Sequence, residues 1–244
     1  FERYSLDMLE TSNISLMGQS RIAINYLNDV VYGGGSQIFS DLYVEAAMKT
    51  SDPSPALLVH ASRVLDKLGN YGIPIHSVYA YNSKADLFCT SCDVPWGNGD
   101  EFFDQGIIPI LNDIKSGKLE NGPIYRYIPK PYSPGLEAVY TYIIPRSSSS
   151  SKLAGALIVN VSASWFDDML SRLFPDMTIL LINENDRVIA DSMGHDPQLK
   201  ERTEEIMRMR TAGSGRFVVR SDEGDDIFFY SAISGTGWCF VRYA

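Results

Sequence analysis

Two cysteines three residues apart, in Cys89-Thr-Ser-Cys92, have a spacing found in redox enzymes and in metal sites. Thioredoxin-like chemistry places the first thiol at a helix N-terminus, whereas Asp93-Val-Pro-Trp follows here and the next predicted helix begins near Asp100. We expect two free thiols, and an oxidising extracellular location leaves a small-loop disulfide between Cys89 and Cys92 as the alternative. The chain has only three histidines and three cysteines, so we predict no metal centre and no cofactor.

Tyrosine is concentrated in one part of the chain. Seven of the 14 tyrosines lie within one stretch of 64 residues, at positions 79, 81, 125, 127, 132, 140 and 142. Strand side chains alternate between two faces, so Tyr79 and Tyr81 share a face of one predicted strand, as Tyr140 and Tyr142 do of another. Stacked phenols suit sugars and other polar ring compounds. The alternative is that tyrosine is simply a good strand former on a half-buried face.

Small and polar residues on a neighbouring strand add to this pattern. Ala154, Ala156, Ile158 and Asn160 share one strand face, and two small residues beside a polar one leave room for a ligand. Arg126 can bind a carboxylate or stack on a sugar ring, although a solvated strand arginine is the alternative. We therefore predict a ligand pocket lined by residues drawn from Tyr79, Tyr81, Tyr125, Arg126, Tyr140, Tyr142 and Asn160.

Catalytic and nucleic-acid-binding patterns are missing from the sequence. Gly213-Ser-Gly215 lacks the strand-to-helix elbow of a hydrolase, and Gly33-Gly-Gly-Ser36 lies within a helical pattern rather than after a strand. Thirty acidic and 21 basic residues give a net charge of −9, which opposes attraction to phosphate polymers. We predict that this segment is not an enzyme and binds no nucleic acid.

The elements that must position these residues begin with helices. Apolar residues recur at spacings of three and four from Tyr4 to Tyr32 and again from Ile38 to Ala47, which predicts a long amphipathic helix. Gly33-Gly-Gly35 interrupts the pattern and predicts a kink or short break. The prolines at 53 and 55 then end the helix, and a further helix is expected over 56–68.

After Gly72 the hydrophobic period changes from 3.6 to 2, which predicts strands. Both halves of the remaining chain give the same order of two strands, one helix and three strands. In the first half we expect strands over 77–82, 86–90, 124–128, 138–144 and 153–161, with a helix over 102–114. In the second half we expect strands over 178–182, 187–190, 215–220, 226–233 and 237–243, with helices over 162–174 and 198–209.

This order resembles the double Cache domains, the extracytoplasmic ligand-binding regions of many bacterial receptors. The stretches that carry the resemblance are Gln37-Ile-Phe-Ser-Asp41, Ser77-Val-Tyr-Ala-Tyr-Asn82, Ala154-Gly-Ala-Leu-Ile-Val-Asn-Val-Ser162 and Gly235-Thr-Gly-Trp-Cys-Phe-Val241. The resemblance implies an α+β fold, with a long N-terminal helix followed by two PAS-like lobes that are each an antiparallel sheet flanked by helices. We therefore expect a helical stalk over 1–70, a membrane-distal ligand-binding lobe over 71–161 and a membrane-proximal lobe over 162–244.

The resemblance also implies a function. Such domains are the extracellular small-molecule sensors of transmembrane receptors, here of the kind found in Gram-positive sensor histidine kinases, whose cytoplasmic kinase would lie outside this segment. Flanking transmembrane helices, a location on the outer face of the cytoplasmic membrane and a homodimer in the full-length receptor would follow. Asn160 stands where many amino-acid-sensing relatives carry an aspartate that holds the ligand's ammonium group, so we expect a sugar first and a carboxylate second.

Two other classes remain open. The first is a free extracytoplasmic solute-binding protein, which would have a parallel, doubly wound sheet in place of consecutive antiparallel strands. The second is a structural or interaction module that binds no ligand. Strand topology separates the first of these from a receptor domain.

Overall fold

The computed structural model describes residues 11, 15, 18–19, 21–118, 123–130, 134–147, 153–175, 178–183, 188–192, 213–221, 224–233 and 237–243. The chain forms two compact units. Unit 1 comprises Phe1–Asn25 and Ala163–Ala244, and unit 2 comprises Tyr26–Ser162. The predicted helix over 198–209 and the tyrosine at position 132 lie outside the described residues.

The helix predicted to be interrupted at its glycines is continuous. Residues 21–29 are helical and pass through a π-helical turn, η1 (Val30–Gly34), into α2 (Gly35–Phe39). Asp29 and Gly35, which flank the turn, both keep right-handed helical backbone angles. The expected break is therefore wrong, and the irregularity takes the form of a widened helical turn.

Close packing explains two of the three glycines. A Cβ atom on Gly35 would lie 2.5 Å from Cδ1 of Ile144, and one on Gly34 would lie 2.9 Å from Cδ1 of Leu68. A Cβ atom on Gly33 would meet nothing within 4 Å. Gly34 and Gly35 thus let the helix approach its neighbours closely, which a larger residue would prevent.

Two further helices of unit 2 lie between α2 and the first strand. They are α3 (Leu42–Lys49) and α4 (Pro55–Asp66), followed by a 3₁₀ turn, η2 (Lys67–Tyr71). The Asp41 carboxylate caps α3 by accepting from the Tyr43 N–H, and the Ser54 hydroxyl caps α4 by accepting from the Leu57 N–H. Pro55 occupies the first turn of α4, where its missing N–H costs nothing.

Six antiparallel strands form the sheet of unit 2, in the order β3-β2-β1-β6-β5-β4. Their bounds are β1 Ile75–Asn82, β2 Leu87–Thr90, β3 Trp96–Asn98, β4 Ile124–Pro129, β5 Leu136–Ser147 and β6 Leu153–Ser162. The sequence prediction missed β3, a three-residue edge strand paired with β2. A short 3₁₀ turn, η3 (Gly99–Glu101), follows β3.

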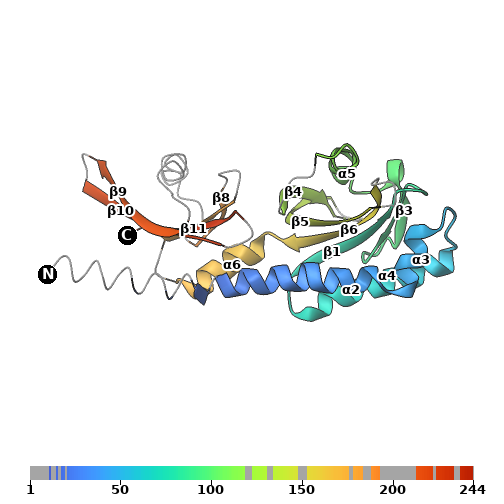
Figure 1. Ribbon diagram of the computed structural model, residues 1–244, viewed down its shortest axis with the longest axis horizontal. Coiled ribbons are helices and arrows are strands. Elements are labelled where there is room, and N and C mark those ends of the chain that lie inside the picture. The colour runs from blue at the N-terminus through green and yellow to red at the C-terminus, as the bar shows by residue number, and fades with distance from the viewer. Residues whose placement is uncertain are drawn as a thin grey trace. The chain divides into compact units, whose positions relative to one another are not determined.

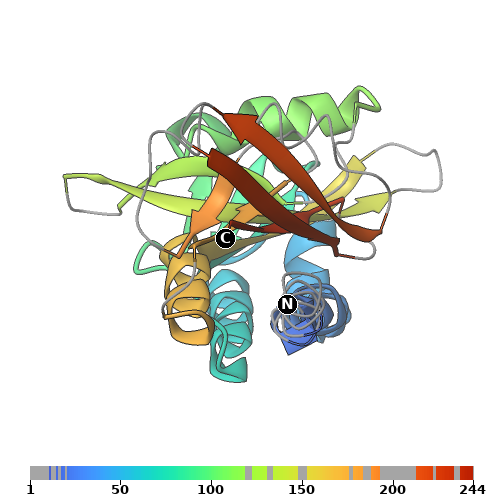
Figure 2. The same cartoon turned by 90° about the vertical axis from the view of Figure 1, so that its left-hand side faces the viewer.

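The helix α5 (Ile107–Lys115) begins five residues later than predicted. Phe102 is buried in an extended conformation, and its ring stacks on that of Phe88 with centroids 4.1 Å apart. Tertiary packing of this segment therefore overrides the helical period that the sequence shows. Figures 1 and 2 show α5 over one face of the sheet and the N-terminal helices of unit 2 along the other.

Unit 1 contains a second antiparallel sheet, in the order β8-β7-β11-β10-β9. Its elements are α6 Ser164–Leu173, β7 Thr178–Ile182, β8 Val188–Asp191, β9 Ser214–Ser221, β10 Gly224–Ala232 and β11 Cys239–Tyr243. Phe166 of α6 lies with its ring centroid 5.7 Å from that of Trp238. The predicted α+β class, with an N-terminal helix and two antiparallel sheets, is confirmed.

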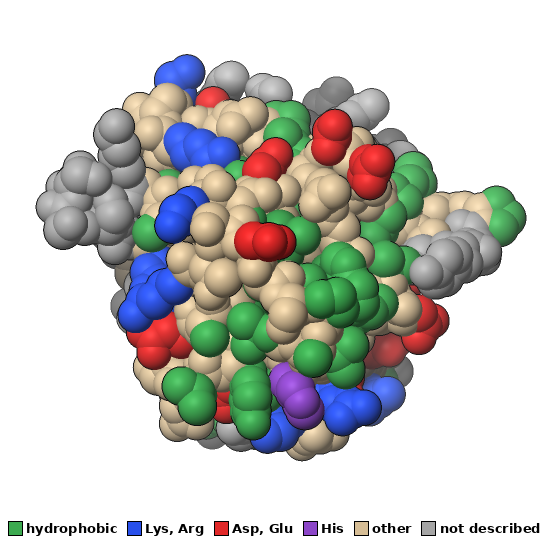
Figure 3. Space-filling view, turned by 90° about the vertical axis from the view of Figure 1, so that its right-hand side faces the viewer, with side chains coloured by type: hydrophobic (Ala, Val, Ile, Leu, Met, Phe, Trp, Pro, Cys, Tyr) green, Lys and Arg blue, Asp and Glu red, His purple; other side chains and the backbone are tan. Residues whose placement is uncertain are grey.

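The described surface is mixed in character. On the face shown in Figure 3, acidic and basic side chains are interspersed, and hydrophobic side chains gather in one area. The exposed apolar residues of unit 2 include Leu42 and Tyr43 at the start of α3, and the Tyr43 ring stacks on His60 with centroids 4.9 Å apart. No helix among the described residues combines the length and the hydrophobicity needed to cross a bilayer.

Candidate functional site

Strand register sorts the predicted site residues onto two faces of the unit 2 sheet. Asn160 of β6 lies opposite both Ser77 of β1 and Thr141 of β5, so these three side chains share a face. We call this the α5 face. Four of the seven predicted residues lie on it, namely Tyr79, Tyr81, Arg126 and Asn160. The other three, Tyr125, Tyr140 and Tyr142, lie on the opposite face.

A continuous chain of hydrogen bonds crosses the α5 face, and we call it the buried network. Arg126 donates from Nε to Oγ1 of Thr141 at 2.7 Å, and Thr141 donates to Oδ1 of Asn160 at 2.7 Å. Asn160 in turn donates from Nδ2 to Oγ of Ser77 at 2.9 Å. Thr141, Asn160 and Ser77 are all buried. Such fully bonded polar groups fix the relative positions of β1, β4, β5 and β6.

The buried network ends in an ion pair. The Arg126 guanidinium donates to both carboxylate oxygens of Asp104, at 2.5 and 2.6 Å, and to Oδ1 of Asn160 at 3.3 Å. The Asp104 side chain is fully buried and that of Arg126 is 10% exposed. Asp104 lies three residues before α5, in the segment where the sequence predicted helix. The pair carries no net charge and joins β4 to the start of α5.

Tyr79 lies beside the buried network. Its hydroxyl accepts a hydrogen bond from Ser77 at 3.2 Å, and its ring packs edge-on against Phe102 with centroids 5.1 Å apart. Burial raises the pKa of the Tyr79 phenol, and the nearby negative charge of Asp104 raises it further. The hydroxyl is therefore protonated at neutral pH and can serve as a hydrogen-bond donor to a ligand.

At the opposite end of the buried network lies a half-exposed pair. His76 contacts Oγ of Ser77 through Nδ1 at 3.1 Å and a carboxylate oxygen of Glu137 through Nε2 at 3.1 Å. Glu137 also lies 3.7 Å from Nζ of Lys130. Ser77, Asp104, Thr141, His76 and Glu137 were not predicted as site residues. For Ser77 the sequence does contain a signal, because Ser77 and Tyr79 are two residues apart on one strand and therefore share a face.

The opposite face of the sheet packs on helices. The Tyr142 ring is fully buried and meets Tyr32 of η1 edge-on, with centroids 5.9 Å apart. Its hydroxyl has no hydrogen-bond partner among the residues that the structure describes. Tyr140 packs against Tyr125 with centroids 5.2 Å apart. Tyr142 therefore belongs to the contact between sheet and helices, and Tyr140 lies on the same face of the sheet, away from the buried network.

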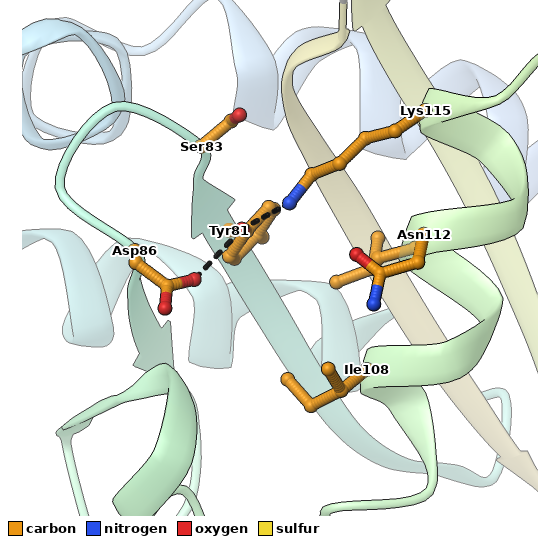
Figure 4. Close-up of a pocket in the computed structure, with 7 residues that line it drawn as sticks. Tyr81, Ser83, Asp86, Ile108, Asn112 and Lys115 are labelled. Atoms are coloured by element: carbon orange, nitrogen blue, oxygen red, sulfur yellow. Dashed lines mark hydrogen bonds between the residues drawn. The ribbon is translucent and has the colours of Figure 1, made fainter.

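A surface hollow of about 270 Å³ lies alongside α5. Figure 4 shows Lys115, Asn112 and Ile108 of α5 lining one side and Tyr81 and Asp86 lining the other. Lys115 donates from Nζ to the Tyr81 hydroxyl at 2.9 Å, and that hydroxyl donates to Oδ1 of Asp86 at 2.8 Å. Burial, followed by the bond to Asp86, raises the pKa of the Tyr81 phenol, so Tyr81 remains the donor.

All three cysteines are free, so the alternative of a bond between Cys89 and Cys92 is not realised. Burial raises the pKa of the Cys89 thiol to about 12 and that of Cys92 to about 11. The Cys89 thiol donates to the carbonyl of Leu58 at 3.3 Å. Both thiols are thus structural rather than reactive. Among the described residues, no group of acidic, histidine or cysteine side chains could hold a metal ion.

No protein-family model and no curated protein matches this chain. Solved structures do match it over nearly its whole length. The ligand-binding domain of Mlp24 with asparagine is 12% identical, with a TM-score of 0.59, over 99% of this chain and 94% of that one. The sensory domain of the Campylobacter jejuni chemoreceptor Tlp3 with isoleucine bound is 11% identical, with a TM-score of 0.57, over 98% and 93%.

The extracellular domain of a protein named histidine kinase vpHK1S-Z8 also matches. It is 10% identical, with a TM-score of 0.67, and the match covers 98% of this chain and 95% of that one. At such low identities these likenesses establish the fold alone. They confirm the fold expected from the Cache resemblance: the chain has the two-sheet fold of solved chemoreceptor and histidine-kinase sensory domains.

Proposed function

We propose that this chain is the extracellular sensory domain of a membrane signalling receptor and that it binds a small polar molecule on the α5 face of unit 2. The observation that carries the proposal is the buried network. A charged pair and three uncharged polar side chains lie together beneath a helix, in a fold shared with ligand-binding sensory domains. Polar groups gathered in this way fix the orientation of a ligand and select its chemistry.

Strand topology favours this proposal over a free solute-binding protein. Every strand pairing described in both sheets is antiparallel, whereas a doubly wound sheet would be parallel. The solved structures of similar fold are sensory domains, in line with the expectation that this segment has no catalytic activity. The transmembrane anchors, the receptor dimer and a cytoplasmic kinase remain predictions.

The electrostatics of the buried network favour a ligand without net charge. Arg126 is already neutralised by Asp104, so a simple carboxylate would have to displace a bidentate buried partner. A sugar, the first expectation from the sequence, meets no such obstacle. An amino acid is the second candidate, because its ammonium and carboxylate groups together could take over the two partners of the Arg126–Asp104 pair.

A thermal-shift screen tests the proposal with neutral sugars, simple carboxylates and amino acids as separate sets. A ligand present at 100 times its dissociation constant adds about 2.7 kcal/mol of stability. We expect Asn160→Ala to lower that gain by the share that comes from the buried network and Tyr127→Ala to retain all of it, because Tyr127 is 58% exposed on the far face of β4. Calorimetric titration of both variants separates lost affinity from lost stability. A ligand whose stabilisation is undiminished in Asn160→Ala binds elsewhere.

A further inference from the structure

The hollow alongside α5 has the features of a binding site in its own right. It measures about 270 Å³, slightly below the range of drug-sized pockets, and it is lined from two separate elements. Lys115, Asn112 and Ile108 come from α5, and Asp86 comes from the turn between β1 and β2. We infer that this hollow binds a neutral polyhydroxylated molecule of about monosaccharide size, at a site separate from the buried network.

The charged groups of the hollow are balanced and held in place. Lys115 and Asp86 are both hydrogen-bonded to the Tyr81 hydroxyl, which accepts from the ammonium group and donates to the carboxylate. The Lys115 ammonium also lies 5.1 Å from the centroid of the Tyr81 ring. One positive and one negative group on the lining leave no net charge to attract a simple anion or cation.

The backbone around Asp86 is arranged for its carboxylate. Asp86 has φ +48°, and it is the one non-glycine residue with positive φ among those the structure describes. The carbonyl of Asp86 accepts from the Gly99 N–H at 2.8 Å. A Cβ atom on Gly99 would collide with the Asp86 carboxylate, so glycine at this position leaves the carboxylate its space. Asp86 is thus held by two neighbouring segments before any ligand arrives.

Hydroxyl groups match the lining better than charged groups do. The Tyr81 hydroxyl already shows the required role, because it accepts from Lys115 and donates to Asp86. Lys115 has further N–H donors, Asp86 has a second oxygen, and the Asn112 amide can both donate and accept. Ligand hydroxyls can meet all of these groups, while Ile108 offers an apolar surface to the C–H groups of a sugar.

A zwitterion fits the hollow less well. Lys115 and Asp86 are both exposed, and ion pairs at such positions add little because water screens them. The Tyr81 ring packs against Phe88, with centroids 4.7 Å apart, and the Lys115 ammonium lies 5.1 Å from its centroid, so we expect the site to recognise hydroxyl groups rather than to stack a sugar ring on Tyr81.

This site is independent of the proposed function at the buried network. Tyr81 lies opposite Ala156 on the sheet, whereas Ser77 lies opposite Asn160, four residues away along each strand. Buried apolar side chains of the core between α5 and the sheet separate the two places; they include Tyr79, Phe88, Phe102, Ile107 and Ile158. A ligand can therefore occupy either site alone.

Nuclear magnetic resonance titration of the whole domain tests the inference, with D-glucose, D-xylose and myo-inositol as probes. We expect saturable shifts of the backbone amides near Ser83, Asp86, Asn112 and Lys115. Lys115→Met and Asp86→Asn should each weaken binding at least tenfold. Asparagine tolerates positive φ, so Asp86→Asn keeps the turn while it removes the charge. Lys118→Met is the matched control, because Lys118 is exposed and lies outside the lining.

The same titration of Asn160→Ala separates the two sites. Binding at the hollow should persist in Asn160→Ala even if the buried network proves to bind nothing. The inference is overturned if none of the three probes gives a saturable shift, or if the shifts survive both Lys115→Met and Asp86→Asn. L-alanine binding at these amides more tightly than the sugars would overturn the assigned ligand class.

Discussion

The ion pair between Arg126 and Asp104 gives a quantitative test of how the buried network is built. Its shortest N–O distance is 2.5 Å, and the two side chains are 10% and 0% exposed. Removing one partner of a buried pair typically costs about 3–5 kcal/mol, because the other charge is left buried without compensation. We expect Asp104→Asn to lower the free energy of unfolding by about that amount. The double variant Arg126→Met with Asp104→Leu should lose much less.

A second ion pair in the same unit provides the control. Lys49 and Glu45 of α3 also approach to 2.5 Å, but their side chains are 63% and 33% exposed. Solvent screens such a surface pair, so Lys49→Met should leave the unfolding midpoint within experimental error. Because the two ion pairs have the same shortest N–O distance, comparing their variants isolates the effect of burial on stability.

Urea and thermal unfolding, followed by circular dichroism, measure both effects. For a chain of this size each kcal/mol shifts the melting temperature by about 2–4 °C, so Asp104→Asn should lower it by roughly 6–20 °C. The reasoning is refuted if Asp104→Asn costs no more than Lys49→Met. It is also refuted if the double variant is as unstable as the sum of its two single variants, since the two charges would then be uncoupled.

Three further outcomes follow from the packing. Gly35→Ala should lower the melting temperature, because its Cβ would meet Ile144 at 2.5 Å, whereas Gly33→Ala, which meets nothing, should raise stability by about 1 kcal/mol. Tyr142→Phe removes a buried hydroxyl that has no hydrogen-bond partner within the described part of the chain, so stability in thermal unfolding should stay equal or rise by about 1 kcal/mol; a large loss would contradict this. Cys89 and Cys92, with pKa values of about 12 and 11, should resist iodoacetamide at pH 8, and rapid labelling of the native domain at that pH would show that the thiols are accessible. The contribution of the protonated Cys89 thiol to the free energy of unfolding should be complete below pH 9 and should decline as the pH rises toward 12.

The sequence allowed us to predict which side chains share a face of one strand. It did not allow us to predict which strands' side chains lie together on one face of the sheet. The pairing of Tyr79 with Tyr81, and of Tyr140 with Tyr142, each follows from the period of two. Which of these pairs share a face depends on register between strands, and a shift of one residue reverses the answer. The observed register places Thr141, rather than Tyr140 or Tyr142, opposite Asn160.

Asp104 shows a second limit of sequence reasoning. Its partner Arg126 is 22 residues away, and the local pattern around Asp104 is helical, so nothing nearby marks it as a buried counter-ion. Helical periodicity also predicted one end of α5 accurately and the other end wrongly. The C-terminal end falls at Lys115, close to the predicted position, whereas the N-terminal end is displaced by the packing of Phe102. Long-range contacts, which a single sequence does not display, decide both cases.

The two ends of α5 are attached to the sheet by different chemistry, and this limits how the helix can move. Asp104, just before its first turn, is attached through a buried ion pair, and Lys115, at its last turn, through a partly buried hydrogen bond to Tyr81. The nine residues of α5 span about 13 Å between these anchors. A molecule that displaced Asp104 from Arg126 would free one end while the other stayed attached. The helix would then rotate as a rigid body about its attachment at Lys115, so the end near Asp104 would move much further than the end near Lys115.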